Sequence, residues 1–84
     1  MSWQEAHEAY QNHVMGCPNC YAPKNLYCVQ GAGVRNEYIT EWAFSLPTRD
    51  ERRRLMIVEK QRNPHLYPQL DALVRARLEI QGSE

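Results

Sequence analysis

The spacing of apolar and polar residues along the chain predicts helices and no strands. No alternation typical of a β-strand continues beyond four residues. The first helix is predicted over residues 3–15, where the apolar positions recur at intervals of three and four: Trp3, Ala6, Tyr10 and Val14. Ser2 and Glu5 form a capping box at its start, and Gly16 is suited to its end.

A second helix is predicted over residues 26–45. Its apolar positions are spaced by four and run to the residue beyond it: Val34, Tyr38, Trp42 and Leu46. Gly31 and Gly33 weaken its beginning by up to ~1 kcal/mol each relative to alanine. The same glycines would allow the first helix to approach closely, and Pro47 ends the pattern.

Two further helices are predicted in the second half of the chain. A capping box formed by Thr48 and Glu51 begins a helix over residues 49–62. Pro68 suits the first turn of the last helix, and Gly82 ends it. The apolar positions of that last helix again lie on one stripe: Leu70, Leu73, Val74 and Ile80.

The connection between the first two helices holds a set of candidate metal ligands, His13-x3-Cys17-x2-Cys20-x7-Cys28. A helix places His13 and Cys17 on one face, and the short turn to Cys20 allows two sulfurs to bind one ion. Cys28 arrives at the start of the next helix. Zinc prefers four nitrogen or sulfur ligands at tetrahedral corners. We therefore predict one structural Zn²⁺, because four protein ligands leave no position open for water.

Three other interpretations of the cysteines remain open: an iron–sulfur cluster, a redox pair in the CPNC turn, and free thiols. Three cysteines cannot all pair internally, and no βαβ pattern surrounds the CPNC turn. His7 competes with His13 as the fourth ligand, but it lies about 240° around the helix from it. The cationic side chains of Lys24 and Arg35 are candidates to offset the charge of three thiolates.

The ligands and their neighbours form the pattern H-x3-C-x2-C…Y-C-x2-G…R-x2-Y. It is carried by His13, Cys17, Cys20, Tyr27, Cys28, Gly31, Arg35 and Tyr38. Over residues 10–45 the chain resembles small zinc-binding proteins of bacteria, their phages and other mobile elements, which hold the metal with one histidine and three cysteines. The segment LPTRDERRRLMIVEKQR carries a looser resemblance, over residues 47–80, to a helical module of small phage and plasmid accessory proteins, in which a Gly-Pro turn often stands where this chain has Asn63-Pro64. The resemblance implies zinc ligation and carries over no catalytic residue.

The predicted fold is all-α. A zinc-stabilised helix–knuckle–helix unit occupies residues 1–46, and a C-terminal helical hairpin over residues 47–84 packs on it. A chain of 84 residues builds only a small core, so we expect a bound metal ion to supply additional stability. The formal net charge of zero excludes a strongly basic nucleic-acid coat and an acidic tail.

The sequence predicts a cytoplasmic protein that does not enter a membrane. Residues 1–10 contain two glutamates and no lysine or arginine. No apolar run reaches the length of a signal peptide or a membrane span. In a reducing compartment, cysteines act as ligands or free thiols more often than as disulfides.

The third predicted helix carries most of the candidate contact residues. Its six basic and three acidic residues give a net charge of +3. Arg49, Arg53 and Lys60 share a face that suits solvent, phosphates or an acidic protein. The run Leu55-Met56-Ile57-Val58 is apolar all round, so part of it is expected to pack on the zinc module or on a second copy, which leaves a homodimer open. The residues predicted to contact a partner are Arg49, Arg53, Met56 and Phe44.

The sequence does not predict an enzyme. It contains no recognisable set of nucleophile, base and orienting group, and no phosphate-binding glycine loop. The leading hypothesis is a small zinc-stabilised adaptor or inhibitor that binds a bacterial cytoplasmic protein and is encoded by a phage or mobile element. The alternative is a nucleic-acid-binding transcriptional regulator that uses the basic third helix.

Overall fold

The protein is all-α, as the sequence predicts. A computed structural model describes residues 2–82. The ends of the two predicted modules lie outside the described residues: Met1, Ser83 and Glu84. The elements are α1 (Trp3–Gly16), a short 3-10 helix η1 (Ala22–Lys24), α2 (Val29–Ser45), α3 (Arg49–Arg62) and α4 (Tyr67–Gly82). The part of the chain between residues 2 and 82 contains no strand, only an isolated bridge.

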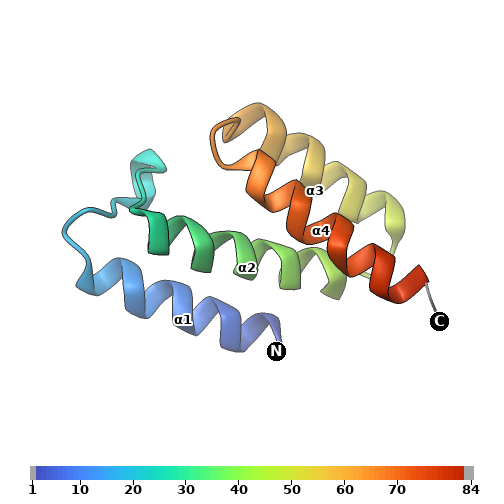
Figure 1. Cartoon of the computed structure of the whole chain (residues 1–84), viewed down its shortest axis with the longest axis horizontal. Coiled ribbons are helices and arrows are strands. Elements are labelled where there is room, and N and C mark those ends of the chain that lie inside the picture. Colours follow the sequence, from blue (N-terminus) through green and yellow to red (C-terminus); the bar gives the residue numbers. More distant parts are fainter. Residues whose placement is uncertain (1, 83–84) are drawn as a thin grey trace.

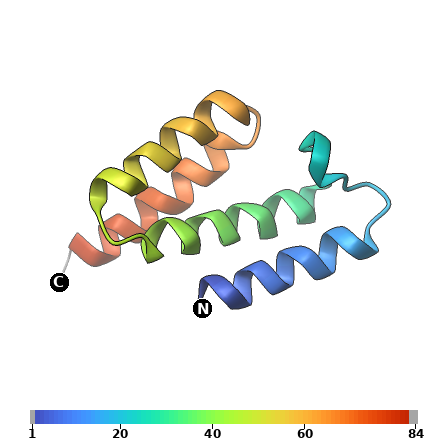
Figure 2. The same cartoon turned by 180° about the vertical axis from the view of Figure 1, so that it is seen from behind.

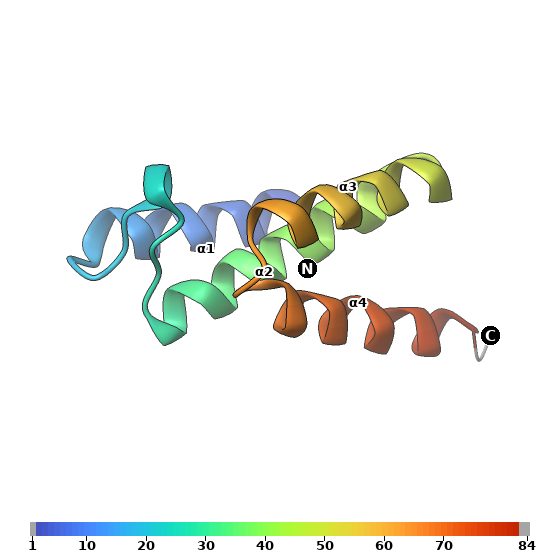
Figure 3. The ribbon, with the colours of Figure 1, turned by 90° about the horizontal axis from the view of Figure 1, so that it is seen from above.

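Helices α1 and α2 form one antiparallel pair and α3 and α4 form a second, and α2 lies centrally, between α1 and the second pair (Figures 1 and 2). The segment 17–28, here called the knuckle, joins α1 to α2 at one end of the molecule. The α3–α4 hairpin lies against α2, which contacts α1, α3 and α4. Figure 3 shows the same arrangement from above. The molecule is elongated, with extents of 41 × 26 × 19 Å.

Side-chain caps begin α1 and α3 where the capping boxes predict them. The Glu5 N–H donates to Ser2 Oγ at 3.3 Å, and the Glu51 N–H donates to Thr48 Oγ1 at 3.2 Å. Each bond satisfies a backbone donor that has no partner inside its helix. The bounds of α3 are those expected from the sequence.

The predicted start of α2 at residue 26 is wrong, because the helix begins at Val29. Leu26 is held in extended backbone, where it pairs with Tyr21 in an antiparallel bridge. Cys28 is the N-cap of α2, and its sulfur accepts a hydrogen bond from the Gly31 N–H. The hydrophobic spacing of the helix gives no sign of this cap, because it is made by a thiol.

The α1–α2 interface brings together the two apolar stripes predicted for these helices. Trp3 and Trp42 meet edge to face with ring centroids 5.0 Å apart, and Tyr10 stacks on Tyr38 at 5.7 Å. Ala6 lies between these contacts along α1 and is 2% exposed. Offset and edge-to-face ring contacts of this kind add to the energy of burial.

Polar side chains join α2 to the hairpin. The buried Arg35 guanidinium on α2 donates to Glu59 Oε2 on α3 at 2.5 Å. Asn63 also donates to that carboxylate, at 2.9 Å, and Asn36 donates to Gln69 Oε1 at 3.1 Å. A buried charge pair of this kind fixes the relative position of two helices because each charge needs its partner.

The described apolar core is small. Its buried members are Ala6, Cys20, Ala43, Leu66, Leu70 and Val74. Most of the large side chains of the α1–α2 pair are only partly buried. A core of this size provides little hydrophobic stabilisation, so the chain needs a further constraint at the knuckle.

Glu59→Ala is expected to lower the free energy of unfolding by about 3–5 kcal/mol, because it leaves the Arg35 guanidinium buried without a counter-charge. Urea denaturation followed by circular dichroism measures the change. The matched control is Asp71→Ala, which removes an exposed pair with Arg75 and is expected to cost less than about 1 kcal/mol. Equal small losses in both variants would contradict the structural role of the buried pair.

Candidate metal centre

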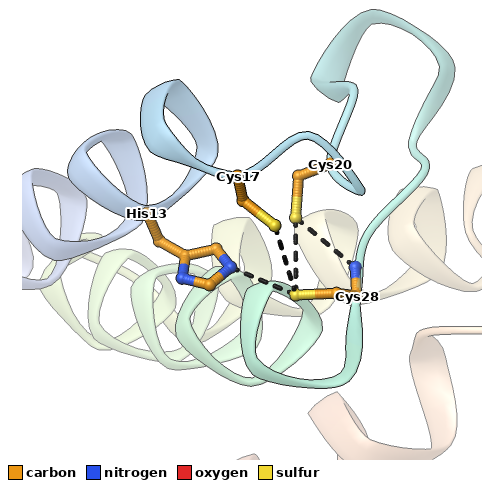
Figure 4. Close-up of side chains that lie close together, drawn as sticks. All are labelled: His13, Cys17, Cys20 and Cys28. Carbon is orange, nitrogen blue, oxygen red and sulfur yellow. Dashed lines mark hydrogen bonds between the residues drawn. The ribbon is translucent and has the colours of Figure 1, made fainter.

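The structure brings the four residues predicted as ligands to one place, although they come from different segments (Figure 4). His13 lies in the last turn of α1, and Cys17 is the residue that caps its C-terminal end. Cys20 follows the short turn of the knuckle, and Cys28 caps the start of α2. The four candidate ligand atoms all lie within 4.8 Å of one another.

Two sulfur–sulfur distances in the group fit tetrahedral coordination of one metal ion, and the histidine nitrogen lies close to the same sulfur. Cys28 Sγ lies 3.1 Å from His13 Nε2, 3.8 Å from Cys17 Sγ and 3.6 Å from Cys20 Sγ. A zinc–sulfur bond of about 2.3 Å implies sulfurs about 3.8 Å apart at the corners of a tetrahedron. All three cysteines are free thiols rather than disulfides. The group can therefore hold a single metal ion.

Backbone N–H groups support the sulfur atoms. The Gly31 N–H donates to Cys28 Sγ at 3.2 Å, and the Cys28 N–H donates to Cys20 Sγ at 3.4 Å. The hydrogen bond from Gly31, followed by that from His13, lowers the pKa of the Cys28 thiol to about 6. Cys28 also lies at the N-terminus of α2, where the helix dipole favours a thiolate.

The Cys20 thiol behaves differently in the absence of a metal ion. The Cys28 N–H lowers its pKa, but burial and the neighbouring thiols outweigh this effect, so the net pKa is raised. Cys20 is 8% exposed and lies at the interior side of the group. A divalent cation offers the positive charge that several converging thiolates require.

Gly31 makes the close approach of the ligands to α2 sterically allowed. A Cβ atom at this position would lie 2.5 Å from Cys20 Sγ and 3.3 Å from His13 Cδ2. The predicted role of the early glycines of α2 in close helix approach therefore applies to Gly31. Gly33 has only Gln69 Nε2 near it, at 3.9 Å.

The other two histidines lie outside the ligand group. His7 packs against the Tyr38 ring with centroids 4.8 Å apart, so the structure selects His13 over His7. His65, in the connection between α3 and α4, is exposed and contacts the Asn25 carbonyl oxygen at 3.3 Å. This contact ties the knuckle to the hairpin.

A pair of tyrosines holds the knuckle on α1. The hydroxyl groups of Tyr10 and Tyr27 lie 2.9 Å apart and share a hydrogen bond. Burial, followed by this hydrogen bond, raises the pKa of Tyr10 above its usual value, so the side chain stays neutral. Because Tyr27 directly precedes Cys28, the bond helps to position that ligand.

Arg35, a candidate to offset the negative charge of the three thiolates, is paired with a carboxylate instead. Arg35 forms its ion pair with Glu59, as described above, and Lys24 is exposed at the end of η1. The groups that contact the sulfurs are instead the backbone N–H groups of Cys28 and Gly31. Backbone donors of this kind cannot be identified from side-chain spacing.

The residues predicted to contact a partner lie far along the chain from the metal ligands. Arg49, Arg53 and Met56 line one groove between α3 and α4. Phe44 is half-buried, and the guanidinium carbons of Arg52 and Arg77 lie 4.7 and 5.3 Å from the centre of its ring. Phe44 therefore packs between helices, whereas the other three line the groove.

Comparison with protein-family models, curated proteins and solved structures finds no match to this chain. Among the described residues, no helix is both long enough and apolar enough to cross a membrane. The chemistry of the donor set, one imidazole and three thiols, is consistent with a structural zinc site.

Gly31→Ala is expected to weaken zinc binding at least about tenfold, because the new methyl group must displace Cys20 or His13. Competition with a chromophoric chelator measures the affinity. Gly33→Ala is the control, since its new methyl group meets only Gln69 Nε2 at an ordinary contact distance of 3.9 Å and alanine is a better helix former than glycine. Equal zinc affinity in the two variants would contradict the packing of Gly31 against the ligands.

Proposed function

We propose that this chain is a non-enzymatic, zinc-stabilised adaptor or inhibitor that binds another protein. The observation that carries the proposal is the ligand group itself, in which four protein donors lie close enough together to fill the four positions of a tetrahedral zinc site. A closed shell leaves no position at which a substrate or an activated water can bind the metal. The metal ion then stabilises the fold, and the function of the protein depends on contacts made by its surface.

The exposed apolar side chains support binding of a protein. Met15 and Val29, which lie on either side of the knuckle, are 86% and 92% exposed. Tyr21 and Leu26 within the knuckle are each more than half exposed. Apolar side chains exposed over one contiguous area are typical of contact surfaces, and these four come from the knuckle and from the ends of the two helices that it joins.

The proposed setting, a mobile element in the bacterial cytoplasm, rests on the sequence resemblance alone.

We propose zinc as the metal because a structural site requires neither a redox change of the ion nor an open coordination position. Metal binding would contribute folding free energy on the order of 10 kcal/mol, which is the magnitude that zinc-finger peptides gain.

The second candidate function is nucleic-acid binding by α3. The basic residues Arg49, Arg53 and Arg54 are exposed near the N-terminal end of this helix, which supports it. Two observations weigh against it: the whole chain has no net charge, and apolar side chains lie beside Arg49 and Arg53. Affinity for nucleic acid rises with the number of phosphates that lysine and arginine side chains neutralise.

Native mass spectrometry of protein purified without added metal is expected to give one zinc per chain. The spectrum should be the same for His7→Ala, since His7 lies outside the ligand group, whereas Cys20→Ser should lose zinc and helical circular dichroism. Spectra at rising protein concentration also report dimer formation. Iron, no metal, or an unchanged melting curve for Cys20→Ser would contradict a structural zinc site.

Fluorescence anisotropy with a duplex DNA of about 20 base pairs separates the two candidate functions. The adaptor proposal predicts only weak binding, with a dissociation constant above roughly 1 µM at physiological salt. A regulator that uses α3 would bind more tightly and would lose affinity steeply between about 50 and 200 mM salt. The second result would replace the adaptor proposal with the nucleic-acid function.

A further inference from the structure

A groove of about 340 Å³ lies between α3 and α4, on the hairpin rather than at the metal centre. The surface of the groove is mostly apolar, although half of its lining residues are arginines. The apolar residues are Met56, Val74 and Leu78, and the cationic residues are Arg49, Arg52 and Arg53.

Helical spacing explains why these side chains converge. Arg49, Arg53 and Met56 lie at positions i, i+4 and i+7 of α3, so they share one face. Val74 and Leu78 are four residues apart on α4 and lie on the face toward α3. The hairpin therefore presents a row of cations beside an apolar strip.

The cations of this groove are available to a partner. Among the described residues, the ion pairs join Arg35 to Glu59, Arg75 to Asp71 and Arg77 to Glu41, and none involves the groove. Arg49 and Arg53 are exposed, whereas Arg52 lies over the Phe44 ring. The Arg52 side chain therefore has a structural role, and Arg49 and Arg53 carry the free charge.

The apolar strip is partly open to solvent. Leu78 is 40% exposed and Met56 is half-buried, whereas Val74 at the base is 5% exposed. A volume of about 340 Å³ accommodates one or two apolar side chains of a ligand. A groove of this size is a point of anchorage for a short segment rather than a whole interface.

We propose that this groove binds an acidic amphipathic segment of a partner protein, which places an apolar side chain against Met56 and Leu78 and its carboxylates beside Arg49 and Arg53. The inference rests on the proposed protein-binding function and names the chemistry of the partner. Charge complementarity selects an acidic ligand. The apolar strip selects a peptide over a nucleic-acid backbone, which offers phosphates and sugars but no aliphatic anchor.

The test is a selection of random 12-residue displayed peptides on the zinc-loaded full-length chain, followed by affinity measurements on synthetic copies of the enriched peptides. The enriched sequences are expected to combine Asp or Glu with Leu, Ile, Phe or Trp. Their affinity should be at least tenfold lower for the double variant Arg49→Glu, Arg53→Glu than for the wild type. The separate variant Leu78→Gln should also lower their affinity at least tenfold.

Matched controls keep the charge and polarity changes but move them out of the groove. The double variant Arg54→Glu, Arg62→Glu changes the charge of the same helix by the same amount at two exposed positions. Ile57→Gln introduces the same amide on α3 at a side chain that is 49% exposed and does not line the groove. Both controls should retain peptide affinity within about twofold, and zinc content and circular dichroism report that every variant is folded.

The outcomes separate the groove from the general function. Enriched peptides that lack acidic residues, or that bind the groove variants as tightly as the controls, would overturn the proposed groove and leave protein binding intact. A chain that enriches no peptide contradicts protein binding as well. A duplex DNA or a second copy of the chain that binds the wild type and is lost on Arg49→Glu, Arg53→Glu would replace the acidic segment as the occupant.

Discussion

The convergence of four metal-binding atoms from α1, the knuckle and α2 is the constraint on which the rest of the structure depends. The buried apolar side chains are few, and two of them are alanines, Ala6 and Ala43. Such a core does not by itself fix two helices and an irregular connection. A bond network through His13, Cys17, Cys20 and Cys28 fixes the ends of both helices at once.

The central helix α2 transmits that constraint to the other half of the molecule. Its first turn is held at the metal centre through Cys28 and Gly31, and the following turns bring Arg35 and Asn36 into contact with the hairpin. Because Arg35 is buried, it requires Glu59, and α3 is thereby held against α2. The groove between α3 and α4 is therefore positioned by a series of contacts that begins at the metal ligands and runs through α2.

Local sequence signals predict the helices and the ligand group well, and they miss the contacts between distant residues. Capping residues and spacing are local, so Thr48 and the bounds of α3 could be predicted. The ion pair of Arg35 joins residues 24 apart in sequence and follows from packing alone. The predicted start of α2 is too early because a cysteine, a candidate metal ligand, acts as the cap of this helix.

X-ray absorption at the zinc edge of the purified chain tests the central claim most directly. The account predicts one nitrogen at about 2.0 Å and three sulfurs at about 2.3 Å around each zinc ion, with no oxygen ligand. Replacement of His13 by alanine should exchange the nitrogen for a water oxygen and leave the three sulfurs in place. An oxygen ligand in the wild-type spectrum, or fewer than three sulfurs, would contradict a closed structural site and return the metal to the candidates for catalysis.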